Sequence, residues 1–416
     1  MSAPPVRQNR TSTGERVGLW LIGACGGVGS TAALGVASLR RRRAASTGLA
    51  SALPPFQDAG LCDIGDIVVG GHEIRSETLE DAVRSLHRSA NVFDAELLAE
   101  CRDDLRAFQR NIRPGTLSGA GRTVQRWVDR GGLIHGSTPR AVVERIAEDI
   151  RQFQKRARLR TVVVVDVASS EAPIRQRRAL SSWKSLNKEL GRRGSFALPS
   201  SSLYALAAVE SGCPFINFTP STGVRIPAIR ERADALEIPY AGADGKTGET
   251  LVKSALAPLF GMRNLEVLSW FGQNILGNRD GEVLQEPRTR ASKIKSKDRT
   301  VQNLVAGRPA TRVGIDYVPS LHDWKVAWDF VHFRGFLGVK MHMQFVWQGC
   351  DSVLAAPLVL DLVRFAEREH RLGRGGVMRH LAVFFKDPID VECLDLASQF
   401  GMLLDHFSAE KRNLRR

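Results

Sequence analysis

VGLWLIGACGGVGSTAALGVASL, residues 17–39, predicts a buried strand, a glycine-rich turn and a helix in immediate succession. The apolar run Val17–Ile22 is typical of a strand inside a parallel sheet. Glycines at 23, 26, 27 and 29 would let backbone N–H groups approach a pyrophosphate at the positive end of the helix. Because this spacing is not G-x-G-x-x-G, a turn that serves only tight packing stays open as an alternative.

Strand and helix patterns continue to alternate after this unit. DIVVGGHEI at 66–74 predicts a second buried strand, with Glu73 where a nucleotide-binding fold places an acid against a ribose hydroxyl. TVVVVDVASSEAP at 161–173 and CPFINFTPSTG at 213–223 add strands whose carboxyl ends are polar, which is where parallel sheets bind ligands. The alternation over the first 240 or so residues predicts a Rossmann-like domain.

The hydrophobic period changes after YAGADGKTGET at 240–250. NLEVLSW at 264–270, RVGIDYV at 312–318 and GVKMHMQFVW at 338–347 alternate with period two, which predicts a half-buried, largely antiparallel sheet. The apolar face of such a sheet needs a cover, and a partner subunit is one candidate.

The C-terminal part returns to α/β patterning. An apolar helix that begins near Asp351 is followed by HLAVFFKDP at 380–388, which predicts a strand, and by a helix from Leu394 to about His406. We therefore expect an α/β protein in which a Rossmann-like NAD-binding domain, 16–245 and 351–416, carries an inserted α+β domain, 246–350, for catalysis and oligomerisation. Residues 1–15 are polar and predict a disordered tail.

Composition narrows the partners. The 416 residues include 59 Lys+Arg against 44 Asp+Glu, and the net charge of +15 suits an anionic partner. Nucleic acid is disfavoured because arginine is spread along the whole chain and aromatic residues make up only 7%. We expect no membrane association, since no apolar stretch has spanning length. Six widely separated cysteines predict reduced thiols in a cytoplasmic protein.

NILGNRDGEVLQEPRTRASKIKSK, residues 274–297, holds the candidate catalytic groups. Lys293 and Lys297 are four residues apart and would share one helix face, where their like charges repel. A site that gathers them suggests an anion between them, most simply a phosphorylated substrate. A solvated basic face is the alternative for a lysine run taken alone.

Several motifs together resemble those of the inositol-3-phosphate synthase (myo-inositol-1-phosphate synthase) family, of the shorter prokaryotic type. PFINFTP at 214–220 resembles the family's F-I-N-G-S-P, LGNRDG at 276–281 its L-G-N-N-D-G, and SKIKSK at 292–297 its S-K-x-x-S-K. DWKVAWD at 323–329 resembles D-x-K-x-A-x-D, and CDSVLAAPLVLDL at 350–362 resembles E-D-S-L-L-A-T-P-L-I-I-D-L. The similarity runs from about Val17 to Pro388.

The resemblance implies a set of site residues. Its active-site positions are Lys293, Lys297, Lys325, Lys386, Asp280, Asn274 and Asn278. Its NAD contacts are Gly26, Gly27, Val28, Gly29, Glu73, Ala168, Ser169, Asp244 and Asp351. This chain departs from the family's G-x-G-G-N-N-G, which becomes GACGGVG at 23–29, from its Trp-Asp, which becomes His72-Glu73, and from its second Asn, which becomes Arg279.

The family converts D-glucose 6-phosphate to 1D-myo-inositol 3-phosphate by transient oxidation of C5 with bound NAD, enolisation, intramolecular aldol closure and re-reduction of C5. Each step develops charge on oxygen or moves a proton, which lysine ammonium groups in a dry site assist. We hypothesise that Lys293 handles the C5 hydroxyl proton, that Lys297 and Lys325 bind the phosphate and the C5 oxygen, and that Lys386 supports the C1 oxyanion.

The resemblance also implies a homotetramer and an activating cation, divalent or monovalent. The alternative function is an NAD(P)-dependent dehydrogenase with net redox turnover on a phosphorylated or acidic small molecule. Such an enzyme would share the glycine turn and the mixed sheet but would release NADH.

Overall fold

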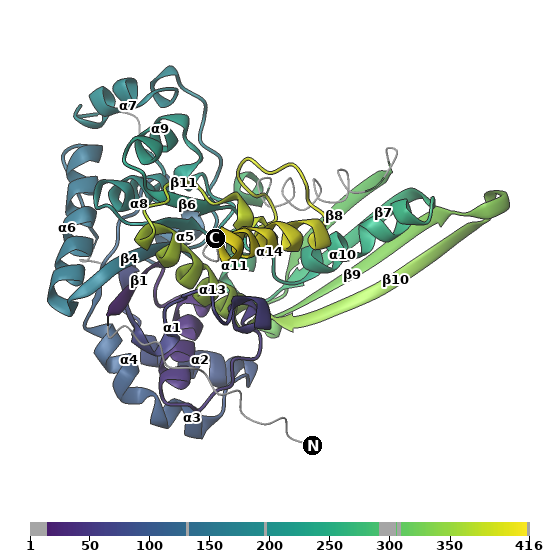
Figure 1. The fold of residues 1–416 in the computed structure, drawn as a ribbon, viewed down its shortest axis with the longest axis horizontal. Coiled ribbons are helices and arrows are strands. Elements are labelled where there is room, and N and C mark those ends of the chain that lie inside the picture. Colours follow the sequence, from purple (N-terminus) through teal and green to yellow (C-terminus); the bar gives the residue numbers. More distant parts are fainter. Residues whose placement is uncertain (1–14, 130–132, 195–197, 291–304, 306–308, 414–416) are drawn as a thin grey trace.

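Two β-sheets organise the chain in the computed structural model, which describes residues 15–413 apart from 130–132, 195–197, 291–304 and 306–308. One sheet is the centre of a layered α/β body. The other extends from that body as a long, nearly flat projection (Figure 1). Most of the tail predicted at 1–15 lies outside the described residues.

The first sheet is parallel throughout, with the order β11-β6-β5-β4-β1-β2-β3. The run 3-2-1-4-5-6 within it is the order of the doubly wound dinucleotide-binding fold. Its strands are β1 (Arg16–Ile22), β2 (Ile67–Glu73), β3 (Ile112–Pro114), β4 (Leu159–Asp166), β5 (Phe215–Asn217), β6 (Pro239–Gly242) and β11 (Gly376–Val377). This confirms the Rossmann-like prediction.

Helices cover both faces of this sheet, which explains the unbroken apolar runs in β1 and β4. Leu19, Leu21 and Val163 face α1 (Gly27–Arg40), α2 (Leu79–Ala90), α4 (Arg102–Gln109), α13 (Asp351–Arg371) and α14 (Leu396–Asn413), with α3 (Ala95–Glu100) alongside α4. Trp20 and Val164 face α6 (Pro139–Ala157), α7 (Trp183–Leu190), α8 (Ser200–Glu210) and α9 (Pro227–Ala235). The chain thus returns after the second sheet to complete the first layer.

The second sheet has the order β10-β9-β7-β8 and is mixed. Its strands are β7 (Glu266–Leu276), β8 (Ala310–Tyr317), β9 (Trp324–Arg334) and β10 (Lys340–Cys350); β9 is antiparallel to β7 and β10, and β8 is parallel to β7. On one face lies α10 (Glu249–Met262), whose Phe260 packs 5.2 Å from the Phe333 ring. The period-two prediction of a mixed, largely antiparallel sheet is confirmed.

The prediction of a strand at 380–388 is wrong. Residues Arg379–Phe384 form a 3-10 helix, η8, in which Leu381 N donates to Met378 O. Leu381, Phe384 and Phe385 are all buried, beneath α14, so a turn of helix buries an apolar run on several sides. A short buried run carries no period that separates the two structures.

None of the helices among the described residues is both long enough and apolar enough to cross a bilayer. All six cysteines fall within the described ranges and carry free thiols, four of them buried.

Candidate active site

A cavity of about 460 Å³ lies at the carboxyl ends of the parallel strands. It spans the loops that follow β1 and β4, the point at which the strand order reverses and where doubly wound sheets bind their ligands. The second sheet closes its other side. From the first sheet and its loops come residues of 22–28, 72–77, 166–171 and 218–221, and from the second sheet and its loops come residues of 277–280 and 322–325. Asp351 and Ser352, at the start of α13, complete this part of the wall.

The glycine turn brings backbone N–H groups to this cavity. Gly23 has φ +81°, a left-handed conformation that favours glycine, and Gly26 is the N-cap of α1. Gly26, Gly27 and Val28 line the cavity, whereas Gly29 lies behind the turn, where an added Cβ would stand 2.5 Å from Ala24 O. A helix N-terminus without a side-chain cap fits a pyrophosphate, so the turn fits NAD.

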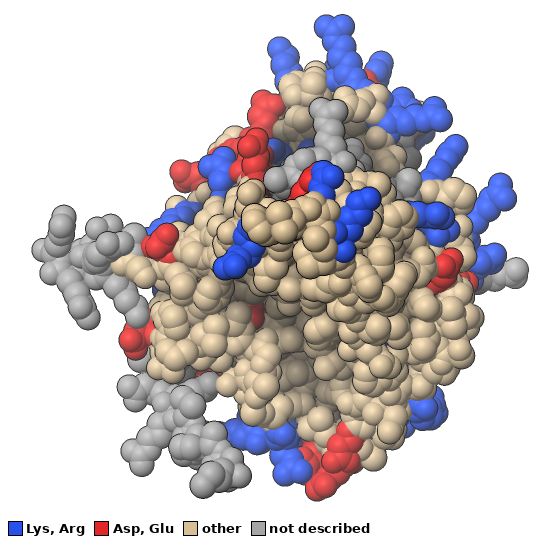
Figure 2. Space-filling view, turned by 90° about the vertical axis from the view of Figure 1, so that its right-hand side faces the viewer, with Lys and Arg blue, Asp and Glu red and all other residues tan. Residues whose placement is uncertain are grey.

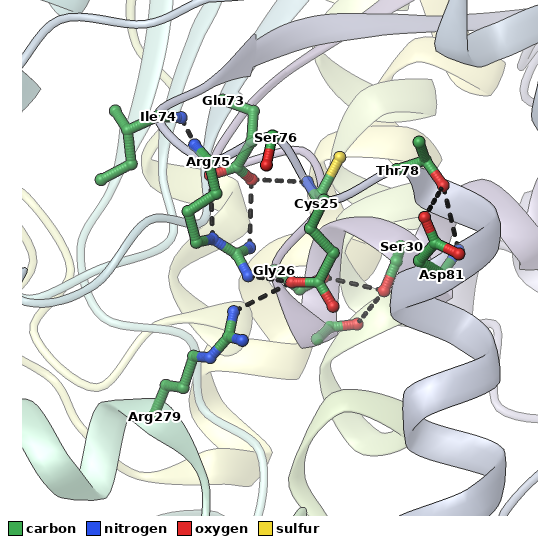
Figure 3. Close-up of polar contacts among 12 residues, drawn as sticks. Cys25, Gly26, Ser30, Glu73, Ile74, Arg75, Ser76, Thr78, Asp81 and Arg279 are labelled. Atoms are coloured by element: carbon green, nitrogen blue, oxygen red, sulfur yellow. Dashed lines mark hydrogen bonds and ion pairs between the residues drawn. The ribbon is translucent and has the colours of Figure 1, made fainter. Parts of the chain in front are cut away.

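Glu73, at the end of β2, ties the turn to the sheet. Its carboxylate accepts hydrogen bonds from Cys25 N and Ile74 N, each at 2.9 Å, and from Arg75 Nε at 3.2 Å (Figure 3). Glu73 lies on the cavity wall, and its carboxylate is engaged by these donors.

Two of the four predicted lysines meet in this cavity. Lys325 from β9 and Lys386 from the segment after η8 are each only 5% exposed, and both line it. Lys386 Nζ donates to Asp244 Oδ1 at 2.8 Å, and Lys325 Nζ lies 3.7 Å from Asp351 Oδ1. These carboxylates offset the cost of burying the ammonium groups. Lys293 and Lys297 lie outside the described residues.

The turn after β7 crosses to the first sheet. Asn278 Oδ1 accepts from Gly281 N at 3.1 Å and caps α11 (Arg279–Val283), while its Nδ2 donates to Asp351 Oδ2 at 3.3 Å. Asp280 Oδ1 accepts from Ser170 Oγ at 3.2 Å, beside Ala168 and Ser169 on the cavity wall. Asn274 is fully buried one layer back, inside β7.

Four acids on the described wall were not among the predicted site residues: Glu77, Asp166, Glu171 and Asp323. Asp323 accepts from Ser352 N at 3.0 Å and from Ser352 Oγ at 2.9 Å, so it caps α13 from another element. Burial raises the pKa of Asp166 to about 7 and that of Glu171 to about 7, which lets either carboxyl exchange a proton near neutrality. Asp323 could have been found from the sequence, because it stands two residues before the predicted site residue Lys325. The raised pKa values of Asp166 and Glu171 come from burial, which leaves no local signal in the sequence.

Away from the cavity, Glu369, His380 and His406 bring their ligand atoms within 4.8 Å of one another. The two imidazole rings stack at 3.8 Å with an interplanar angle of 2°, so their in-plane lone pairs run parallel instead of converging on one ion. Arg368 Nη1 already binds the Glu369 carboxylate at 2.9 Å. We assign no metal to this cluster.

A doubly wound sheet whose first crossover begins at a glycine turn defines the Rossmann class of NAD-binding proteins, and here a second sheet supplies a buried lysine to the same cavity. Within that class, residues 51–407 match the family model described as myo-inositol-1-phosphate synthase. The chain belongs to this family, which confirms the resemblance carried by the motifs.

Comparisons with individual proteins indicate the same family. Inositol-3-phosphate synthase 1 of Bacteroides thetaiotaomicron is 31% identical over 396 residues, which cover 90% of each chain. Inositol-3-phosphate synthase isozyme 1 of Arabidopsis thaliana is 31% identical over 318 residues, 74% of this chain and 60% of the plant protein. The crystal structure of inositol-3-phosphate synthase from Caenorhabditis elegans shares the fold with a TM-score of 0.83 at 24% identity, covering 95% of this chain and 86% of that one.

Proposed function

We propose that this protein is an NAD-dependent inositol-3-phosphate synthase, an isomerase that converts D-glucose 6-phosphate to 1D-myo-inositol 3-phosphate. The observation that carries the proposal is a family match over residues 51–407 on a chain whose Rossmann cavity holds buried Lys325 and Lys386. When bound, NAD supplies hydride acceptance and return at C5 of the sugar, so that the reaction has no net redox change.

The lysines provide charge and protons where the sugar needs them. Lys386, oriented by Asp244, supports the C1 oxygen as the ring closes, and Lys325, beside Asp351, binds the C5 oxygen or the phosphate. Lys297 shares that binding, and Lys293 exchanges the C5 hydroxyl proton. Asn274, Asn278 and Asp280 belong to the same site.

The cofactor contacts are assigned to the loops of the first sheet and to the start of α13. Backbone N–H groups at 27–29 hold the pyrophosphate at the positive end of α1, and Gly26, whose N–H donates to Gly23 O at 3.0 Å, lines the cavity beside it. The remaining contacts are Ala168, Ser169, Asp244 and Asp351, while Glu73 forms part of the wall and holds the glycine turn in place through its bond with Cys25 N. An activating cation, divalent or monovalent, completes the proposed site.

The proposal divides the chain into an NAD-binding domain, 16–245 with 351–416, and a catalytic and oligomerisation domain, 246–350. The sheet face away from α10 exposes Phe271 at 39%, Trp328 at 41% and Val346 at 65%. Seen from the side on which β9 and β10 project, uncharged residues also cover a broad area below a rim of Lys and Arg (Figure 2). We assign this sheet to the subunit interface of a homotetramer, and we place the protein in the cytoplasm. Each chain has a mass of 45.7 kDa, so light scattering that gives this monomer mass would refute the assembly.

Incubation of the purified protein with NAD and glucose 6-phosphate tests the function. Inositol phosphate should accumulate while the nicotinamide absorbance of NADH stays low, because each reduced cofactor is reoxidised within the same turnover. NADH that accumulates in step with consumed sugar would instead identify the dehydrogenase alternative. A heat-inactivated sample of the same protein provides the blank.

A further inference from the structure

Four charged side chains of alternating sign stand together at the end of β2. Arg75 binds Glu73 on one side (Figure 3) and Glu77 on the other. Arg279 Nη1 lies 3.1 Å from Glu77 Oε2. All four line the cavity. Arg279 comes from α11, beside the second sheet, so this network joins two separate parts of the chain.

Glu73 has no capacity left to serve as the acid that meets a ribose. Its Oε2 accepts from Cys25 N and from Arg75 Nη2, and its Oε1 accepts from Ile74 N and from Arg75 N and Nε. A carboxylate offers about four lone-pair sites, and these five bonds use them all. Glu73 is therefore a positioning residue, which fixes the turn and orients Arg75.

The next acid along, Glu77, is better placed to act on the cofactor. Its side chain is 23% exposed, on the cavity wall, and its carboxylate lies between the guanidinium groups of Arg75 and Arg279. The end of β2 is where a Rossmann fold receives the adenosine ribose; an acid there suits the 2′-hydroxyl of NAD, and an arginine suits the 2′-phosphate of NADP.

We propose that Glu77 sets the choice between NAD and NADP, an inference that rests on the proposed function. The Glu77 carboxylate pairs with both arginines, and together with Glu73 it balances their charge, so that a phosphate at the 2′ position is repelled. Without that charge, Arg75 and Arg279 form a ready clamp for the phosphate, because paired guanidinium groups bind phosphate oxygens well. Arg279 stands where the motif L-G-N-N-D-G has asparagine, so the second arm of the clamp is a departure of this chain from the motif.

Titration of the full-length protein with NADH and with NADPH, followed by cofactor fluorescence, tests the inference by binding alone. The wild type should favour NADH, and Glu77→Gln should shift the ratio of the two dissociation constants towards NADPH by at least about tenfold. Adding Arg279→Gln to that variant should remove the gain. Glu96→Gln is the matched control and should leave the ratio unchanged. Glu96 is an exposed residue of α3 that pairs with Arg43.

An unchanged ratio in Glu77→Gln would overturn the inference while the proposed function stands. Arg279→Asn, at a side chain that is 54% exposed, tests the same point without touching Glu77: it leaves the Glu77 charge less compensated, so NADPH binding should weaken relative to NADH. A wild type that binds NADPH as tightly as NADH would also refute the role of Glu77. If the wild type bound neither dinucleotide, the proposed function itself would fail.

Discussion

Lys386→Met is expected to lower turnover of glucose 6-phosphate by about 10²–10³-fold, the effect of removing one preorganised donor to a developing oxyanion. The side chain is buried in the cavity and held by Asp244 at 2.8 Å, so it cannot be replaced by a solvent cation. Methionine keeps most of the volume and removes the charge. Product formation is measured as inositol phosphate, and NADH binding by fluorescence should persist.

Two further variants sharpen this test. Lys386→Arg keeps the positive charge but does not release a proton at neutral pH, so any activity it retains reports the electrostatic part alone. Lys340→Met removes the same charge from the exposed start of β10 and should leave turnover unchanged. Wild-type turnover by Lys386→Met, in a protein with an unchanged melting temperature, would remove Lys386 from the site.

Gly29→Ala is expected to impair both cofactor binding and stability. A Cβ at position 29 would stand 2.5 Å from Ala24 O and 2.8 Å from Gly23 O, and both are backbone atoms of the turn itself. The turn must therefore move, at a cost of about 1–3 kcal/mol for an overpacked position. We expect the dissociation constant of NADH to rise by at least about tenfold, because the same turn places the N–H groups at the pyrophosphate.

Gly35→Ala is the matched control in the same helix. There a Cβ would meet only the flexible Leu360 Cδ1, at 3.4 Å, and alanine is favoured over glycine in a helix interior by about 1 kcal/mol. This variant should bind NADH normally and melt at or above the wild-type temperature in a thermal unfolding scan. Equal NADH affinity in Gly29→Ala and Gly35→Ala would show that the close approach at 29 does not shape the cofactor site.

Where a strand is buried on both faces, the sequence predicted it well. VGLWLI and TVVVVD became β1 and β4 because helices from both sides cover them. The period of two in β10 likewise placed Met343 and Phe345 on the face that α10 covers. The strand prediction for HLAVFFKDP failed because a segment buried from several directions has no hydrophobic period to detect.

Local sequence patterns predicted less of the site than of the fold. Lys325 and Lys386 lie on separate elements, and only the family resemblance predicted that they share a cavity. The engagement of Glu73 by five donors depends on how β2 meets the glycine turn, which residue types do not specify. The same is true of Asp323, which caps a helix that begins 28 residues later.

The return of α13 and α14 to the layer of α1 constrains how the chain can be made. Val359 and Phe365 pack in the same core cluster as Leu19 and Val163. During synthesis on the ribosome, one apolar face of the parallel sheet must therefore stay partly uncovered until residues beyond Phe365 have emerged. Chaperone capture of partly synthesised chains, or insolubility of a product truncated before Asp351, would be the cellular cost of building one layer from both ends of the polypeptide.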